Sequence, residues 1–176
     1  MTSPTRAWMP WFGLLARLVT GVVWLLAGAL KVTDPAGSVR AVRAYDLLPE
    51  AIVPTVGHLL PMAEILLGVT LILGLLTRAS GVLSSLLFIA FIFGISWAWA
   101  KGLQIDCGCF GGGGFDADAT DKYPWDIARD VGLLALSAWL IWRPATKFSL
   151  DGVLFRSSTP PETYEQESEV HVSQSR

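Results

Sequence analysis

The sequence predicts an all-α membrane protein, a polytopic bundle of four transmembrane helices with a short interfacial helix in its first loop. Of the 176 residues, 52% are hydrophobic and 16% are charged, whereas about a quarter of the residues are charged in an ordinary soluble domain. The apolar residues form four long runs. Because backbone amides inside a bilayer must be satisfied within the segment, each run is expected to be a helix.

The first predicted span covers residues 11–30 and ends at Lys31. It is long enough to cross a hydrocarbon core of about 30 Å. A cleaved signal peptide is the alternative, with Ala27-Gly28-Ala29 as the cleavage site. We favour the span because Arg17 interrupts the would-be signal sequence and the apolar run is long for one.

The loop after the first span is expected to contain the interfacial helix. Asp34-Pro35 is typical of a helix N-cap followed by proline at the first helical position. Val39, Val42 and Tyr45 then recur every three residues, which suits a helix lying in the membrane interface. An irregular loop with scattered charge is the alternative.

The second and third spans are predicted over residues 52–76 and 79–100, with a tight turn around 77–80 that makes them antiparallel neighbours. Pro61 cannot donate a backbone hydrogen bond, so a kink is expected there. The alternative is a shorter helix that begins near Pro61.

The fourth span is predicted over residues 127–142, which gives a membrane domain over residues 11–145. Residues 1–10 are expected to form a cytoplasmic segment. Residues 155–176 are acidic and lack apolar periodicity, so they are expected to be a disordered tail. The formal net charge of −2 and the absence of a basic stripe argue against nucleic-acid binding.

The chain has two cysteines, and they lie in the motif Cys107-Gly108-Cys109-Phe110-Gly111 between the third and fourth spans. Gly108 allows the bend that a disulfide between them requires. Such a small ring is expected to be strained, oxidising and labile. The glycines at 111–114 allow either loop movement or close backbone approach.

The cysteine pair has three readings: a redox pair, a static disulfide, or a metal half-site. No metal is expected, because two cysteines supply only half of a typical site. No cofactor is evident, and a quinone is a candidate that nothing in the sequence supports. Lys101 is expected to favour a thiolate, and Asp106 to oppose it.

The orientation in the membrane is nearly undecided by charge, because Lys and Arg residues are almost equally divided between the two sides. Disulfide chemistry is favoured outside the cytosol. The protein is therefore expected to be a multi-pass cell-membrane protein with cytoplasmic termini and an extracytoplasmic cysteine loop.

Glu64, Arg17 and Arg129 are charged residues within the predicted spans. Glu64 is near the middle of the second span, where an ionisable group must face the bundle or be protonated. We expect it to pair with Arg17; a proton or quinone-related role, or a bond to a serine hydroxyl or backbone group, is the alternative. Arg129 is expected to extend to the membrane surface, with binding to the cysteine loop as the second choice.

The motif Cys107-Gly108-Cys109-Phe110-Gly111, followed by Arg129-Asp130, resembles the MauE branch of the DoxX-like membrane proteins, the methylamine utilisation membrane protein. Further matching segments lie in the first two spans: Gly28-Ala29-Leu30-Lys31, Asp34-Pro35, and Pro61-Met62-Ala63-Glu64 with Gly68 and Gly74. The resemblance covers roughly residues 11–145.

The resemblance implies a four-helix membrane bundle linked to thiol–disulfide exchange with a thioredoxin-like partner. The leading hypothesis is thus a membrane redox protein in which Cys107 and Cys109 relay disulfides or electrons to a thioredoxin-like or other extracytoplasmic thiol protein. Because the chain has no second cysteine pair, it is expected to act through a partner. The rival hypotheses are a non-catalytic membrane scaffold and, less favoured, a small-molecule transporter.

Overall fold

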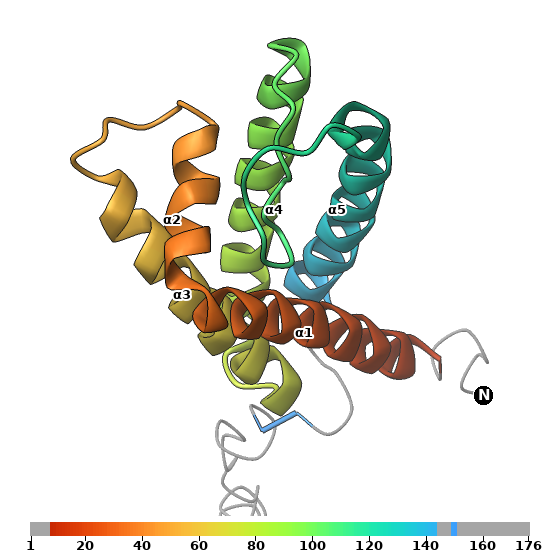
Figure 1. Ribbon diagram of the computed structural model, residues 1–176. Helices are drawn as coiled ribbons and strands as arrows, with labels where there is room; N and C mark the ends of the chain where they lie inside the picture. The colour runs from red at the N-terminus through yellow and green to blue at the C-terminus, as the bar shows by residue number, and fades with distance from the viewer. Residues whose placement is uncertain (1–7, 144–148, 151–176) are drawn as a thin grey trace, which may run out of the picture.

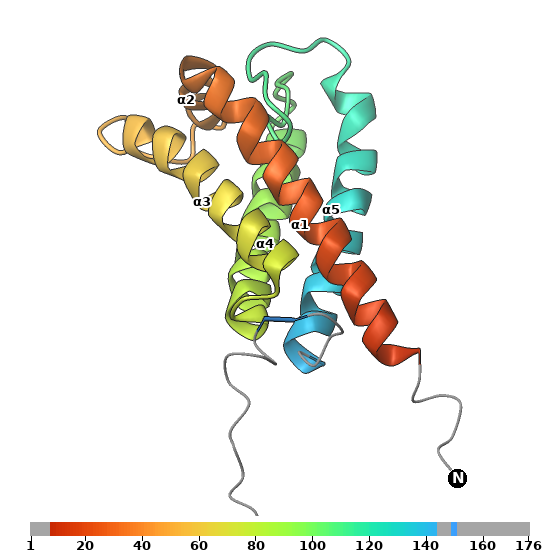
Figure 2. The ribbon, with the colours of Figure 1, turned by 90° about the horizontal axis from the view of Figure 1, so that it is seen from below.

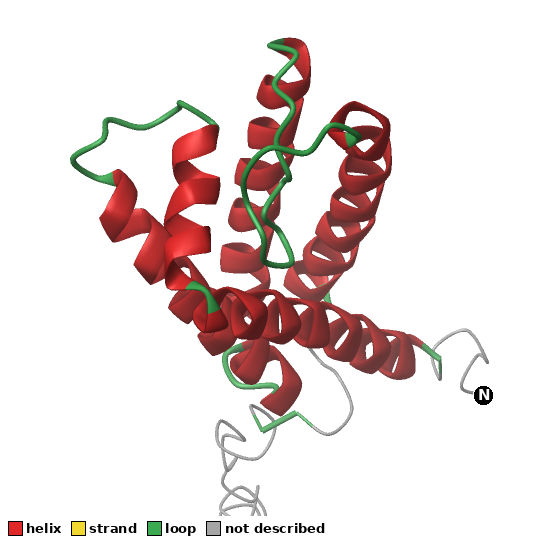
Figure 3. Ribbon diagram, viewed as in Figure 1, coloured by secondary structure: helices red, strands yellow, loops and turns green. Residues whose placement is uncertain are grey.

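The computed structural model describes residues 8–143 and 149–150 of the chain. In this part the chain is helical, with five helices and no named strand (Figures 1 and 3). The predicted acidic tail and most of the N-terminal segment lie outside the described residues. The helices are α1 (Met9–Thr33), α2 (Pro35–Ala44), α3 (Val53–Leu73), α4 (Thr77–Ala100) and α5 (Ala119–Trp142).

Three helices, α1, α3 and α4, are long and apolar enough to cross a membrane. The first three predicted spans are therefore confirmed as candidates, with ends shifted by up to three residues. The helix α5 begins at Ala119, eight residues before the predicted start of the fourth span near 127, and it is not among these three candidates, so the fourth span stays a prediction. The first half of α5 contains several charged residues between Asp121 and Asp130. This part of the helix is therefore not visible as an apolar run in the sequence.

The helix α3 runs without interruption through Pro61 and ends at Gly74, earlier than predicted. Gly74 has φ 69°, a left-handed conformation that glycine adopts easily and that commonly ends a helix. The N–H of Leu75 donates back to Thr70 O at 2.9 Å. The turn between α3 and α4 consequently lies at 74–76 instead of 77–80.

The helices α1 and α3 pack closely through glycines, and Figure 2 shows α1 crossing in front of the bundle. A Cβ atom at Gly28 would lie 2.7 Å from Pro61 O, and one at Gly68 would lie 2.7 Å from Leu25 N. Small residues of this kind let helix backbones approach each other within a membrane. The position of this crossing determines which residues of α1 lie opposite which residues of α3.

A second, polar contact joins α1, α4 and α5. The indole N–H of Trp24 donates to Ser84 Oγ at 2.8 Å, and Ser84 Oγ is 2.9 Å from Ser137 Oγ. All three residues are buried. Hydrogen bonds between buried side chains of different helices hold α4 and α5 in register under α1.

The predicted short helix after α1 is confirmed as α2. The Asp34 carboxylate caps it by accepting from Gly37 N at 2.8 Å, and Pro35 opens it. α2 packs on α3, where Ser38 Oγ donates to Gly57 O at 2.7 Å. A Cβ at Gly57 would lie 2.7 Å from Val39 Cγ2, so the two helices are in direct contact.

Candidate functional site

The cysteine loop, residues 101–118, folds back against the helices as a short irregular hairpin (Figure 3). An antiparallel bridge joins Ile105 to Phe115 at its base, and Asp106 N donates to Gly114 O at 2.9 Å. The buried Tyr123 of α5 holds the same base, with its hydroxyl 2.8 Å from Leu103 O. The hairpin is therefore anchored to α5 before it reaches the cysteines.

The tip of the loop lies against α1 and α2 through its glycines. A Cβ at Gly111 would lie 3.4 Å from Leu30 Cβ, and one at Gly113 would lie 2.5 Å from Ala41 Cβ. Gly111 and Gly113 also have φ of 84° and 94°, which side-chain-bearing residues rarely adopt. The glycine run thus provides close backbone approach, the second of the two roles considered for it.

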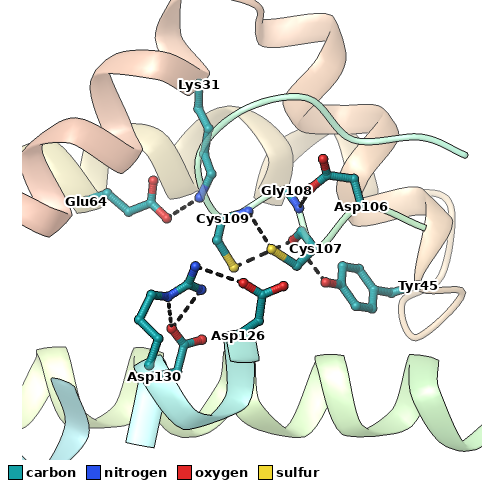
Figure 4. Close-up of polar contacts among 10 residues, drawn as sticks. Lys31, Tyr45, Glu64, Asp106, Cys107, Gly108, Cys109, Asp126 and Asp130 are labelled. Carbon is teal, nitrogen blue, oxygen red and sulfur yellow. Dashed lines mark hydrogen bonds and ion pairs between the residues drawn. The ribbon is translucent and has the colours of Figure 1, made fainter. Parts of the chain in front are cut away.

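The two cysteines are adjacent free thiols (Figure 4). Cys109 N donates to Cys107 Sγ at 3.4 Å, and Cys109 Sγ lies 3.8 Å from Cys107 O. The Tyr45 hydroxyl, at the end of α2, donates to Cys107 O at 2.9 Å. Gly108 between them has φ 66°, the bend expected at this position, and its N–H donates to Asp106 Oδ1 at 2.8 Å.

The two thiols differ in exposure and in acidity. Cys107 is half-buried, whereas Cys109 is only 7% exposed. The hydrogen bond from the Cys109 thiol lowers the pKa of Cys107 below its ordinary value. That same interaction, together with burial, raises the pKa of Cys109. Cys107 is consequently the thiol that ionises first, and the thiolate is the nucleophilic form.

The two charges expected to influence the thiols, Asp106 and Lys101, lie in different settings. Asp106 and Asp126 oppose ionisation of Cys107 by raising its pKa, as was expected for Asp106. Lys101 instead lies over the ring of Trp97, 4.9 Å from its centroid.

Arg129 connects α5 with the cysteine loop. Its guanidinium donates to Asp126 Oδ1 at 2.9 Å and to Asp130 Oδ1 at 2.9 Å. The same guanidinium lies 4.9 Å from the ring centroid of Phe110, next to Cys109 in sequence. The second choice, contact of Arg129 with the cysteine loop, is present in the structure, and the extension of Arg129 to the membrane surface stays a prediction. The neighbouring carboxylates and the ring of Phe110 hold Arg129 at the loop.

Glu64 pairs with Lys31, so the predicted Arg17–Glu64 pair was wrong. Both partners are buried, with side-chain exposures of 0% for Glu64 and 5% for Lys31. The glycine crossing explains the partner: Gly28 lies opposite Pro61 and Ile65, whereas Arg17 lies against Gly74. Gly74 is almost three helical turns beyond Glu64, about 15 Å along the axis.

Two cavities meet at the cysteines. A polar cavity of about 230 Å³ lies toward α5, where its walls include Asp106, Cys107, Lys122 and Arg129. An apolar cavity of about 490 Å³ lies toward α2, α3 and α4, and its walls include Lys31, Tyr45, Cys107 and Cys109. Cys107 is thus in contact with both cavities.

The profile of a family described as methylamine utilisation protein MauE matches residues 9–143, which is most of the chain. The chain belongs to the MauE family. The matched region contains α1 to α5 and the cysteine loop, so the recognised resemblance is confirmed. No curated protein and no solved structure matches this MauE-family chain.

Sequence reasoning missed several contacts of this MauE-family site. The sequence predicted neither the pairing of Lys31 with Glu64 nor the hydrogen bond from the Tyr45 hydroxyl to Cys107 O. A usable signal was present in α2, where Gly37, Ala41 and Tyr45 are spaced four residues apart and so share one helix face. This face, with two small residues and a hydroxyl, is the one against which the cysteine loop packs.

Proposed function

We propose that this chain is an integral membrane thiol–disulfide redox protein. In this proposal Cys107 and Cys109 exchange a disulfide with a thioredoxin-like protein or another extracytoplasmic thiol protein. The supporting observation is the setting of Cys107, a half-buried thiol that lines a polar cavity and accepts a hydrogen bond from a second, buried cysteine. This is the arrangement expected of an attacking thiol backed by a resolving thiol.

The exchange proceeds through a mixed disulfide. A thiolate of the reduced partner attacks the Cys107 sulfur of the Cys107–Cys109 disulfide, and Cys109 leaves as a thiolate that takes up a proton. The second partner thiol then attacks the partner sulfur of the mixed disulfide, and Cys107 leaves. The partner loses two electrons and two protons, and the chain gains both. The reverse direction follows the same path.

We further propose that α5 is the fourth span and that the cysteine loop faces the outside of the cell. The charges in the first half of α5 are partly neutralised within the helix, since Arg129 pairs with Asp126 and Asp130. The helix continues from Val131 to Trp142 without a charge. A membrane-impermeant thiol reagent applied to intact reduced cells should label Cys107. Labelling only after lysis would contradict this orientation.

The exchange is tested by trapping the partner. In cells that express Cys109→Ser, Cys107 should accumulate in a mixed disulfide that is released by reductant and identified by mass spectrometry. Cys107→Ser is the matched variant and should trap far less, because Cys109 is 7% exposed.

A scaffold without redox chemistry predicts a different result. If Cys107→Ser and Cys109→Ser both leave partner oxidation and complex assembly unchanged, the exchange proposal is wrong. The cysteines would then have only a structural role.

A further inference from the structure

We propose that the apolar cavity beside the cysteines binds the ring of a membrane quinone, which accepts an electron pair from the Cys107–Cys109 dithiol. This inference depends on the proposed exchange function and supplies its missing electron acceptor. It also gives the exchange a direction, from the partner dithiol to the quinone.

The cavity has the size and lining of a site for an apolar ligand. Its volume is about 490 Å³, within the range of about 300–1,000 Å³ that is typical of small-molecule sites. Its walls come from the end of α1, from α2, α3 and α4, from the loop after α2 and from the cysteine loop. Aliphatic and aromatic side chains predominate among the described lining residues, including Val42, Leu48, Val56, Leu60, Leu87 and Phe91.

The cavity is accessible from the apolar exterior of the helices. Phe93 and Ala90, both on α4, line it and are exposed, and Phe93 is 60% exposed. α4 is one of the candidate membrane spans. A ligand would therefore enter from the bilayer, which selects a lipid-soluble electron acceptor over a water-soluble one.

Lys31 provides a polar contact suited to a quinone. Among the described lining residues it is the one with a formal charge at neutral pH, apart from an ionised thiol. Its ammonium group pairs with Glu64 and lies 5.2 Å from the ring centroid of Phe91. An ammonium group has three N–H donors, so it can also donate to a carbonyl oxygen. A quinone has carbonyl acceptors on a flat apolar ring, whereas the hydrocarbon tail of a lipid has none.

The redox step balances between the dithiol and the quinone. The two S–H bonds of Cys107 and Cys109 break and one S–S bond forms, which releases two electrons and two protons. The quinone takes up both and becomes a quinol. Both cysteines line the apolar cavity, and Cys107 also lines the polar cavity. The same pair of sulfur atoms can therefore react with a protein partner and with a quinone in turn.

The test uses the full chain in lipid nanodiscs with decylubiquinone, whose fully substituted ring does not add thiols readily. The protein is reduced, freed of reductant and kept anaerobic before the quinone is added. Disulfide formation is followed by alkylation and mass measurement, and quinol formation by absorbance. We expect one quinol per disulfide, formed faster than with a free Cys-Gly-Cys peptide.

Two variants fill the cavity from different helices, Ala90→Trp on α4 and Val42→Trp on α2. Each should slow oxidation by quinone about tenfold or more, since loss of the ligand's space costs at least ~1.4 kcal/mol of binding. Ala135→Trp is the matched control, because Ala135 is exposed on α5 and does not line this cavity. It should leave the rate unchanged.

A second measurement separates the two proposals. Chemically oxidised protein is mixed with dithiothreitol, and reduction of the Cys107–Cys109 disulfide is followed. Normal reduction in Ala90→Trp and Val42→Trp shows that the exchange site is intact. If the parent protein exchanges normally but decylubiquinone oxidises it no faster than the peptide, or both filled variants react like the parent, the quinone site is wrong and the exchange function stands. If the parent neither exchanges nor is oxidised, both proposals fail.

Discussion

The two sides of the cysteine loop differ in chemistry although they share Cys107. On the side of α5 the cavity is small and polar. Two cations line it, Lys122 and Arg129, and two carboxylates hold Arg129. On the side of α2, α3 and α4 the cavity is larger and apolar, and its cation, Lys31, is held by the buried Glu64. One sulfur therefore lies between a surface suited to a polar protein partner and a surface suited to an apolar molecule.

This difference shows how a single cysteine pair can serve two reactants. A relay must meet its donor and its acceptor without allowing them to react directly. The two cavities meet that need, because Cys107 is the one described lining residue that they share.

The largest effect is expected from Lys31→Met on the apolar side. The substitution leaves Glu64 buried without its cation, which costs about 3–5 kcal/mol of stability for a buried pair. Thermal unfolding in detergent should show a large fall in melting temperature. The double variant Lys31→Met/Glu64→Leu should recover most of it, because an apolar pair can replace a buried ion pair. Additive losses in the double variant would contradict this account.

On the polar side, Arg129→Leu should cost less, about 1–3 kcal/mol, because Arg129 and Asp126 have side-chain exposures of 22% and 16% and water can replace part of the lost hydrogen bonding. The loss is expected to come mainly from Asp130, which is buried. The substitution should also slow exchange with a protein partner, since the stacking of Arg129 on Phe110 is lost. Arg129→Lys should retain part of the ion pairing. A variant that is as stable as the parent and exchanges equally fast would show that the cluster is dispensable.

The partition between the cavities is tested by Gly113→Ala. The added Cβ would lie 2.5 Å from Ala41 Cβ and 2.9 Å from Gly37 O, so the loop must shift away from α2 at a cost of about 1–3 kcal/mol. Gly102→Ala is the control, since the φ of Gly102 is also positive, at 65°, but a Cβ added there would meet no neighbouring atom within 4 Å. It should cost about 1 kcal/mol. Alkylation of Cys109 should accelerate in Gly113→Ala and stay slow in Gly102→Ala.

The smallest effect concerns the acidity of Cys107. Thiolate alkylation rises with pH through the thiol pKa, and contact with Cys109 holds the pKa of Cys107 below its ordinary value. In Cys109→Ala this contribution is lost, so the midpoint of the pH–rate profile should move to higher pH. Cys109→Ser keeps a hydroxyl donor and should move it less. Coincident profiles for all three proteins would show that Cys109 does not tune Cys107.

The sequence was sufficient to predict the helices but not how they meet. Uninterrupted apolar runs located α1, α3 and α4 because the length and composition needed to cross a membrane are local properties. Asp34-Pro35 likewise located the start of α2, since a helix cap depends on neighbouring residues. The first turns of α5 were not found because residues 119–126 are mostly polar, and an apolar run locates only the apolar part of a helix.

The partner of Glu64 could not be found from sequence because it depends on the level at which α1 crosses α3. Two cations, Arg17 and Lys31, lie on α1. The glycine contacts between α1 and α3 place Lys31, and not Arg17, next to Glu64. The family profile confirms the recognised resemblance. The redox role of the cysteines, their partner and their orientation stay predictions.

The pairing of Lys31 with Glu64 also has a consequence for biosynthesis. The ribosome completes α1 well before α3, so Lys31 is made before the carboxylate that neutralises it. A lone ammonium group is costly in the hydrocarbon region and extends toward the headgroups. The end of α1 can therefore settle into its final depth only when α3 arrives with Glu64. The charges of Lys31 and Glu64 thus neutralise each other once both helices are present, and Leu30, beside Lys31, is then in place to support the cysteine loop at Gly111.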